Sequence, residues 1–273
     1  MIHKPQDKKL LTRRRLLGLL AVGAGVTVAA GAYLSRDLQV KRRTLRLPRW
    51  DADGFRVVQI SDLHMNDAAG MALGREAVRL AVAEKPDLVV YTGDFSNHSD
   101  PSIMSLIPQA FEGLQEAGCP CIAIMGNHDY WHKYPERVAE QVALTKLRLL
   151  RNETVDLGGV VIAGLDDALE KRHDPSILKG VDAKSVLALL HEPDSVSDMP
   201  LNVSLQLSGH SHGGEVCLPG GLPLYTPRGS KRYWSGFYDG ARVPLFVSKG
   251  AGTVGPGRVF CPAEINVLTL KPA

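Results

Sequence analysis

Five short polar clusters follow apolar runs along this 273-residue chain, and their side chains can bind metal ions or move protons. The clusters are Asp62-Leu63-His64, Gly93-Asp94, Gly126-Asn127-His128-Asp129, His191-Glu192-Pro193-Asp194 and Gly209-His210-Ser211-His212-Gly213-Gly214. Each apolar run has the pattern of a strand, so each cluster falls at a strand's carboxyl end, where α/β proteins usually place their chemistry. We therefore expect the five clusters to form one site.

Seven residues of these clusters are potential metal ligands: Asp62, His64, Asp94, Asn127, His191, His210 and His212. Mixed oxygen and nitrogen donors suit Mn²⁺, Fe or Zn²⁺ better than Ca²⁺, which prefers oxygen alone. Seven donors are too many for one ion and suit two, provided that one carboxylate bridges. In Asp-x-His and His-x-His, extended backbone would turn both ligands to the same side. The sequence therefore predicts two divalent metal ions, with Mn, Fe and Zn as the candidates.

Two metals about 3.5–4 Å apart can hold a bridging hydroxide for in-line attack on phosphorus. His128, beside the ligand Asn127, would then be free to act as general acid toward the leaving oxygen, and we expect Asp129 to orient its ring. Taken singly the motifs are weak, because a lone His-x-His is often a pair of surface side chains and Gly-Asp is a common turn. Their joint occurrence, in this order and at strand ends, favours a metal site.

The clusters need a scaffold that brings strand ends together. Apolar runs at 55–61, 87–91 and 121–125 alternate with helical patterns at about 71–83 and 102–116. This order predicts a parallel βαβαβ unit with right-handed crossovers. The three strand ends would then share one edge of the sheet and bring together Asp62, Asp94 and Asn127.

The second half of the chain predicts a second, mixed sheet. We expect a helix at about 134–146 and a hairpin at 155–165. Further strand-like runs lie at 185–190, 203–207, 215–218, 232–237, 245–248 and 265–270. Two facing sheets with helices outside make a four-layer αββα sandwich, which we place in a single domain over residues 54–273.

Residues 1–34 have the pattern of an export signal or a membrane anchor. Thr12-Arg13-Arg14-Arg15-Leu16-Leu17 resembles a twin-arginine signal, and an apolar run continues to Leu34. Ala30-Gly31-Ala32 offers a cleavage site, whereas about 19 apolar residues can also just span a bilayer uncleaved. We expect an exported or membrane-anchored protein of the bacterial cell envelope, with the cytoplasmic membrane face as the alternative. Residues 35–53 are expected to form a basic linker.

The positive charge of the chain belongs to this leader. Residues 1–46 hold eleven Lys/Arg and two Asp, a net of +9, so the chain's total of +3 leaves residues 47–273 at −6. We therefore expect no specific nucleic-acid binding by the body, a monomeric protein, and any membrane association through the N-terminus. The four cysteines lack the paired spacing of a zinc or redox motif and are expected to behave as buried apolar residues.

The series Asp-x-His, Gly-Asp, Gly-Asn-His-Asp, His and Gly-His-x-His resembles the signature of calcineurin-like metallophosphoesterases. The resemblance runs from Phe55 to the end and is greatest to YaeI-type bacterial phosphodiesterases and their exported YkuE-type relatives, through the runs at 189–194, 209–214, 231–233 and 247–253. It implies an αββα fold and a phosphate ester or phosphodiester substrate. It further implies that Asp62, His64 and His212 bind the first metal, that Asn127, His191 and His210 bind the second, that Asp94 bridges, and that His128 is catalytic.

Two other functions remain open at this point. A lipid pyrophosphate of envelope synthesis, of the UDP-2,3-diacylglucosamine type, is the alternative substrate, because resembling enzymes include such hydrolases. A non-catalytic scaffold is the remote alternative, and it predicts degraded ligands where none is missing.

Several residues near the clusters bear on substrate fit. Glu215 stands where the resembling family usually has Gln. Arg228, Lys231 and Arg232 could meet a phosphate or lie in a solvated loop. The aromatic rings of Tyr130 and Trp131 could stack on a leaving group or pack against the protein.

Overall fold

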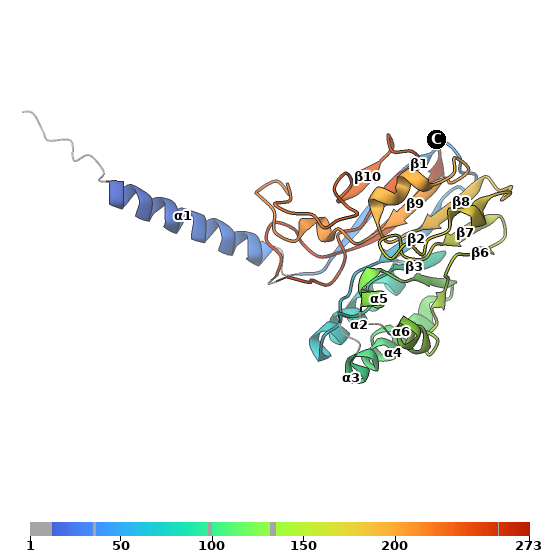
Figure 1. Ribbon diagram of the computed structural model, residues 1–273, viewed down its shortest axis with the longest axis horizontal. Helices are drawn as coiled ribbons and strands as arrows, with labels where there is room; N and C mark the ends of the chain where they lie inside the picture. The colour runs from blue at the N-terminus through green and yellow to red at the C-terminus, as the bar shows by residue number, and fades with distance from the viewer. Residues whose placement is uncertain (1–12, 35–36, 98–99, 132–134, 256) are drawn as a thin grey trace, which may run out of the picture.

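The computed structural model describes residues 13–34, 37–97, 100–131, 135–255 and 257–273. Two six-stranded mixed sheets face each other and form the body, and an N-terminal helix projects from it (Figure 1). The expected α/β sandwich of two mixed sheets is therefore confirmed.

The first sheet carries the predicted βαβαβ unit. Its order is β1 (Gln39–Leu47), β12 (Glu264–Pro272), β2 (Phe55–Ile60), β3 (Leu88–Thr92), β4 (Cys121–Ile124) and β5 (Arg148–Leu149). The strands β2 to β5 are parallel, and β12 is antiparallel to β2. The outer face is covered by α2 (Ala68–Ala83), α3 (Pro101–Met104), α4 (Leu106–Phe111), η1 (Glu112–Ala117) and α6 (Pro135–Val142).

The single helix expected over 102–116 is divided into α3, α4 and the 3₁₀ helix η1. Pro108 has no N–H to donate to the carbonyl of Met104, and its ring crowds that carbonyl, so a continuous α-helix is disfavoured where α3 ends.

The second sheet has the order β10 (Gly236–Tyr238), β11 (Leu245–Val247), β9 (Leu205–Ser208), β8 (Ser185–Leu189), β7 (Val160–Gly164) and β6 (Glu153–Asp156). The predicted hairpin is the antiparallel pair β6 and β7. The outer face of this sheet packs against short 3₁₀ helices, η2 (Pro175–Leu178) and η3 (Pro193–Asp198), rather than long α-helices. The strand expected at 215–218 forms only isolated bridges, from Val216 to Val259 and from Cys217 to Pro223.

Three apolar layers hold the sheets in place. Successive residues of β2 serve two of them, because Val57 points between the sheets and Val58 points toward the helices. Both faces of the central strands are thus buried, which explains why their sequences are continuous apolar runs rather than alternating ones.

The segment 35–53 is not a simple linker, contrary to our expectation. Residues 39–47 form β1, which pairs with β12 in parallel over nine residues. Leu45 and Leu47 are buried, whereas Arg42, Arg43 and Arg46 are exposed. The basic residues that suggested a linker are therefore the solvent-facing side chains of an edge strand.

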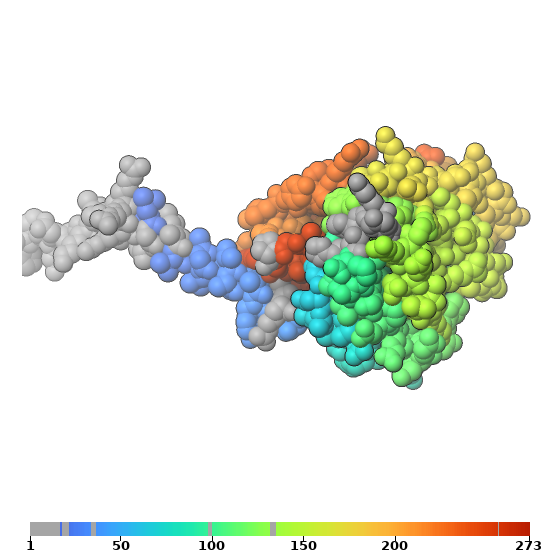
Figure 2. Space-filling model, turned by 60° about the horizontal axis from the view of Figure 1, so that its bottom comes forward, coloured from blue at the N-terminus to red at the C-terminus, as the bar shows by residue number. Residues whose placement is uncertain are grey.

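The helix α1 (Arg13–Leu34) extends well beyond the body (Figures 1 and 2). Its inner end contacts the body where the N–H of Phe260 donates to the carbonyl of Gly31 at 3.2 Å. Among the described residues, no helix has both the length and the apolar character to cross a membrane. Residues 1–12, and with them Thr12 of the twin-arginine pattern, lie outside the described part of the chain.

Candidate metal centre

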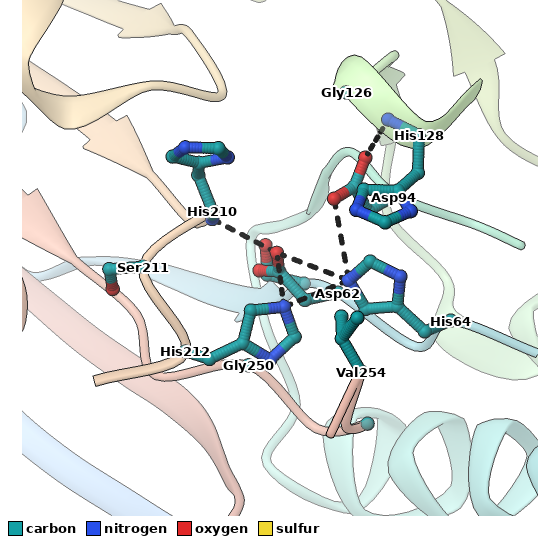
Figure 3. Close-up of polar contacts among 12 residues, drawn as sticks. Asp62, His64, Asp94, Gly126, His128, His210, Ser211, His212, Gly250 and Val254 are labelled. Atoms are coloured by element: carbon teal, nitrogen blue, oxygen red, sulfur yellow. Dashed lines mark hydrogen bonds and ion pairs between the residues drawn. The ribbon is translucent and has the colours of Figure 1, made fainter. Parts of the chain in front are cut away.

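The five clusters converge at the carboxyl ends of strands from both sheets. Asp62 and His64 follow β2, Asp94 follows β3, and Asn127 opens α5 (Asn127–Trp131) after β4. In the second sheet, His191 follows β8, and His210 and His212 follow β9. Figure 3 shows the side chains of Asp62, His64, Asp94 and His212 pointing toward one another.

Left-handed backbone turns five of the seven predicted ligands into the site. The φ angles are 55° for Asp62, 46° for His64, 61° for Asp94, 66° for His210 and 51° for His212. We expected extended backbone in Asp-x-His and His-x-His, and this is wrong in both motifs. Asp62 and His64 do share one donor group, as expected of ligands on the same side, whereas His210 and His212 belong to different groups. Left-handed backbone costs a non-glycine residue about 1–2 kcal/mol, and such strain concentrates at functional sites.

A first donor group consists of Asp62, His64 and His212. The Nε2 atoms of His64 and His212 are 2.8 Å apart, and Oδ1 of Asp62 lies 3.5 Å from Nε2 of His212. These are the three residues that the family resemblance implied for the first metal.

A second donor group consists of Asp94, His191 and His210. Asn127 joins it, because its Oδ1 lies 2.8 Å from Nδ1 of His210. Oδ2 of Asp94 is 3.1 Å from Nε2 of His191 and 3.3 Å from Nε2 of His64, so this carboxylate stands between the two groups. That is the place a bridging ligand would occupy.

Oxygen acceptors outside the donor groups fix which ring nitrogen of each histidine is free. Nδ1 of His191 donates to the carbonyl of Thr92 at 2.6 Å, and Nδ1 of His64 donates to Oδ1 of Asn97 at 2.5 Å. Nδ1 of His212 faces Oε1 of Glu215 at 3.2 Å. In these three rings Nε2 faces the site.

His210 has the opposite arrangement. Its Nε2 donates to the carbonyl of Arg228 at 2.7 Å, so Nδ1 carries the lone pair toward Asn127. Each histidine thus has an outer acceptor that orients its ring, as in protein metal sites generally.

Two buried atoms of the site have no hydrogen-bond partner among the described residues and are free to bind a metal ion. These atoms are Oδ2 of Asp62 and Nε2 of His191. Such atoms are costly unless a cation or donor meets them.

Burial lowers the pKa of His64 to about 3, which keeps its ring neutral as a ligand must be. Burial favours the neutral acid of Asp94, but the neighbouring His191 and His64 hold its pKa well below the ordinary value.

Two close-fitting glycines leave space for these donors. A Cβ on Gly209 would lie 2.3 Å from Oδ2 of Asp62, and one on Gly126 would lie 2.3 Å from Oδ1 of Asp94. Any larger residue at either place would displace a carboxylate of the site.

His128 lies close enough to His64 and Asp94 to form a third candidate donor group with them, but its side chain is less buried than theirs. Its backbone N–H donates to Oδ1 of Asp94 at 2.9 Å, and its ring meets the ring of His64 edge-on at 4.6 Å. The ring of Trp131 covers its other side at 4.2 Å. Burial lowers the pKa of His128 although Asp94 acts to raise it.

Asp129 does not orient the His128 ring as we expected. One of its carboxylate oxygens accepts the N–H groups of Gly126 and Asp94, and the other accepts that of Phe95, all at 2.9 Å. No hydrogen bond from this carboxylate to the His128 ring occurs in the described part of the chain. Its role is to join the loop after β3 to the loop after β4.

The comparison with known families agrees with this geometry. Residues 55–214 match the family model described as calcineurin-like phosphoesterase. The chain belongs to the calcineurin-like phosphoesterase family. It is thus a metal-dependent hydrolase of phosphoric esters, as the motifs indicated.

Three relatives are similar to this phosphoesterase over most of its length. It is 31% identical to the uncharacterized metallophosphoesterase YkuE of Bacillus subtilis, over 97% of this chain and 99% of that protein. It is 24% identical to phosphodiesterase YaeI of Escherichia coli, over 96% and 100% of the two chains. It is 27% identical to UDP-2,3-diacylglucosamine pyrophosphatase LpxG of Chlamydia muridarum, over 85% and 88%.

A pocket of 570 Å³ opens onto the donor groups of this phosphoesterase. Its wall includes His128, Trp131, Tyr225, Arg228 and Val254. Arg228 is therefore the residue of the predicted basic trio that can meet an anion in the pocket.

The other basic and aromatic candidates have different surroundings. The ammonium of Lys231 lies over the ring of Tyr225 and donates to the carbonyl of Thr226. Tyr130 is buried, and its hydroxyl donates to Asp166. The guanidinium of Arg172 lies over the Tyr130 ring. Tyr130 thus has the packing role, while Trp131 lines the pocket.

Sequence reasoning missed the supporting residues. Asn97 and the carbonyls of Thr92 and Arg228 gave no motif, because a backbone acceptor has no sequence signal. Glu215 was noted only as a departure from the family pattern.

Glu215 supports both His212 and the pocket wall. Its Oε1 accepts the hydroxyl of Thr253 at 2.7 Å and the N–H of Val254 at 2.6 Å, and Oε2 accepts the N–H of Gly255 at 2.9 Å. Burial acts to raise the pKa of Glu215, but His212 and these donors together hold it well below the ordinary value. Glu215 is therefore a carboxylate that joins the ring of a candidate metal ligand, His212, to the loop that forms one wall of the pocket.

Proposed function

We propose that this phosphoesterase is a two-metal phosphodiesterase. The observation that carries the proposal is the position of Asp94, whose Oδ2 lies within 3.3 Å of histidine nitrogens from both donor groups. The pocket of 570 Å³ above these groups has room for a substrate with two ester substituents. The relative YaeI, which carries the name phosphodiesterase, supports the choice of a diester.

Two bound divalent cations would supply a nucleophile made from water at neutral pH and positive charge beside the phosphoryl oxygens. The chain's own residues complete the site around them. The ring of His128 lines the pocket, where it can give a proton to the leaving oxygen. Arg228 supplies positive charge to a phosphodiester anion, and Trp131 shields one face of the His128 ring from water.

The proposal is tested with chelator-treated protein. Addition of Mn²⁺ or Zn²⁺ should restore cleavage of an activated aryl phosphodiester, and Asp94→Asn or His212→Ala should remove it. The matched control is His173→Ala, because His173 pairs with Asp198 outside the site and should leave turnover unchanged. Full activity of the Asp94→Asn protein would refute the proposal.

A lipid pyrophosphate is the second candidate substrate. Apolar side chains that line the pocket, Trp131, Leu169, Tyr225 and Val254, favour a substrate with apolar groups. The similarity to LpxG supports a nucleotide-linked diacyl sugar in particular. Release of nucleoside monophosphate from that lipid is the expected result. If the protein cleaves the aryl diester but releases no nucleoside monophosphate, the lipid candidate is rejected and the phosphodiester candidate stands.

For the leader we propose export through the twin-arginine pattern. The support is the set of arginines at the start of α1, Arg13 to Arg15, followed by the apolar remainder of that helix. Replacing Arg13 and Arg14 together by Lys should keep the protein in the cytoplasmic fraction of a bacterial host. Sequencing of the mature N-terminus then separates a cleaved signal from an uncleaved leader.

A further inference from the structure

We propose that a protruding apolar hairpin, residues 216–227, docks this protein on the surface of an anionic lipid bilayer. We call this hairpin the tip. It contains no charged residue over its whole length. Four of its large side chains are exposed to solvent: Leu218 by 46%, Leu222 by 57%, Leu224 by 62% and Tyr225 by 68%. Apolar side chains gathered in this way usually mark a contact surface.

The tip is preformed rather than a loose loop. The N–H of Leu218 donates to the carbonyl of Leu222 at 2.9 Å, and the N–H of Leu224 donates to that of Val216 at 3.0 Å. A turn is closed by the N–H of Gly221, which donates to Leu218 at 2.9 Å. The leucines are therefore held outward by backbone hydrogen bonds, and little ordering would be needed on docking.

The tip lies beside the inner end of α1 (Figure 1). Val216, at its base, bridges to Val259, and the next residue, Phe260, donates to the carbonyl of Gly31 in α1. The helix itself exposes apolar side chains, among them Val22, Val26 and Val28. The uncharged tip and the apolar part of α1, residues 16–34, thus leave the body from neighbouring places, as expected of a protein that contacts an interface.

Basic residues follow the tip on its C-terminal side, whereas the acidic Glu215 precedes it. Arg228, Lys231 and Arg232 follow it directly and are exposed. Their charge stands out because residues 47–273 carry a net of −6. Cationic side chains on one side of an exposed apolar hairpin match the anionic headgroups and acyl boundary of a bilayer.

A second copy of the chain fits this surface less well. In a two-fold symmetric dimer formed through the tips, the basic residues of one copy would lie close to the same basic residues of the other copy. The charges would then repel, whereas anionic headgroups attract both sets. The tip is also continuous with the site, because Val216 at its base follows the candidate ligand His212 by four residues. Docking would therefore place the pocket next to the lipid surface.

The first test introduces a tryptophan as a local reporter in the full-length protein. Leu222→Trp is mixed with vesicles of brominated phosphatidylcholine and phosphatidylglycerol, whose bromines quench tryptophan that enters the acyl region. The added emission, relative to the parent protein, should be quenched for Leu222→Trp and not for Leu201→Trp. Leu201 is the matched control because it is an exposed leucine, 66% accessible, that lies outside the tip. This readout reports on the tip even if α1 binds the vesicles by itself.

The second test measures binding with the double variant Leu222→Glu/Leu224→Glu. Its affinity for phosphatidylglycerol-containing vesicles should fall about tenfold or more, since two exposed apolar side chains that would enter the lipid are lost and two negative charges are added. The control Leu144→Glu/Leu201→Glu should bind within about twofold of the parent. Cleavage of a water-soluble aryl phosphodiester should be the same in all these proteins, which separates loss of docking from loss of the proposed function.

Three outcomes would overturn the proposal. One is Leu222→Trp emission that the brominated lipid leaves unquenched. Another is equal binding of the two double variants. The third is a dimer, seen by sedimentation, that the tip variant abolishes while vesicle binding is unaffected.

Discussion

Glu215→Gln changes one atom at the point where the metal centre meets the pocket wall. The carboxylate now accepts four donors, three on Oε1 and one on Oε2. An amide can offer only one oxygen, because its nitrogen is itself a donor. The amide oxygen is expected to take the position of Oε1, facing His212, Thr253 and Val254. Its NH₂ group would then face the N–H of Gly255, which has lost its acceptor.

The magnitude follows from these contacts. Gly255 is exposed, so its N–H can turn to water, and the loss in unfolding free energy should be at the low end, about 1 kcal/mol. The effect on metal affinity, which acts through His212, should be more pronounced than the effect on stability. A neutral acceptor makes the ring a weaker ligand, and outer partners of this kind change metal affinity by roughly 10–100-fold. We expect about a tenfold loss for Glu215→Gln and a loss nearer 100-fold for Glu215→Ala, which removes every acceptor.

The assay is competition for Zn²⁺ or Mn²⁺ between the protein and a chromophoric chelator, together with thermal unfolding of the metal-free protein. Glu170→Gln is the matched control, because Glu170 lines the same pocket and carries the same charge. Its metal affinity should stay within about twofold. The reasoning is refuted if Glu215→Gln binds metal as the parent does, or if Glu170→Gln weakens binding equally, which would indicate a general charge effect.

Three other substitutions test separate parts of the site. Tyr91→Phe removes a buried hydroxyl that bonds the backbone after β2 at 3.1 Å and after β3 at 2.9 Å, so urea unfolding should show a loss of about 2–4 kcal/mol. His128→Ala should keep both metals in elemental analysis but lose about 10²–10⁴-fold in kcat, and loss of a metal equivalent would instead make His128 a ligand. Gly209→Ala would place a Cβ 2.3 Å from Oδ2 of Asp62 and should remove metal from the first donor group, whereas Gly240→Ala, with open space around its Cβ position, should bind normally.

The sequence predicted the donor residues because each of them follows a recognisable strand. An apolar run that ends in polar residues marks a strand end in both sheets, and parallel strands bring their ends together whatever the loops do. Asp62, Asp94 and His191 could therefore be placed before any geometry was known. The edge strand β1 could not, because its exposed arginines hid the two inward leucines.

The role of Asp129 shows where sequence adjacency misleads. Its neighbour His128 suggested a paired acid and base. Both lie in the short helix α5, where successive side chains point about 100° apart and do not face each other. Asp129 therefore reaches inward to three N–H groups, while His128 faces the pocket. The left-handed backbone at His210 and His212 was equally hidden, since their residue types do not favour it as glycine does.

One continuous segment connects the parts of this molecule that act on a substrate. It runs from His210 through His212 and Glu215 to the tip, and so carries two candidate ligands, their positioning carboxylate and the proposed docking surface. The connection is tight, because a Cβ on Gly214 would lie 2.4 Å from Pro223 in the tip. A Cβ on Gly213 would lie 2.8 Å from the side chain of Lys249. A displacement of the tip on a lipid surface would therefore be transmitted to His212 through packed backbone. The same rigidity makes the contacts of Glu215 the place where docking and metal binding can influence each other.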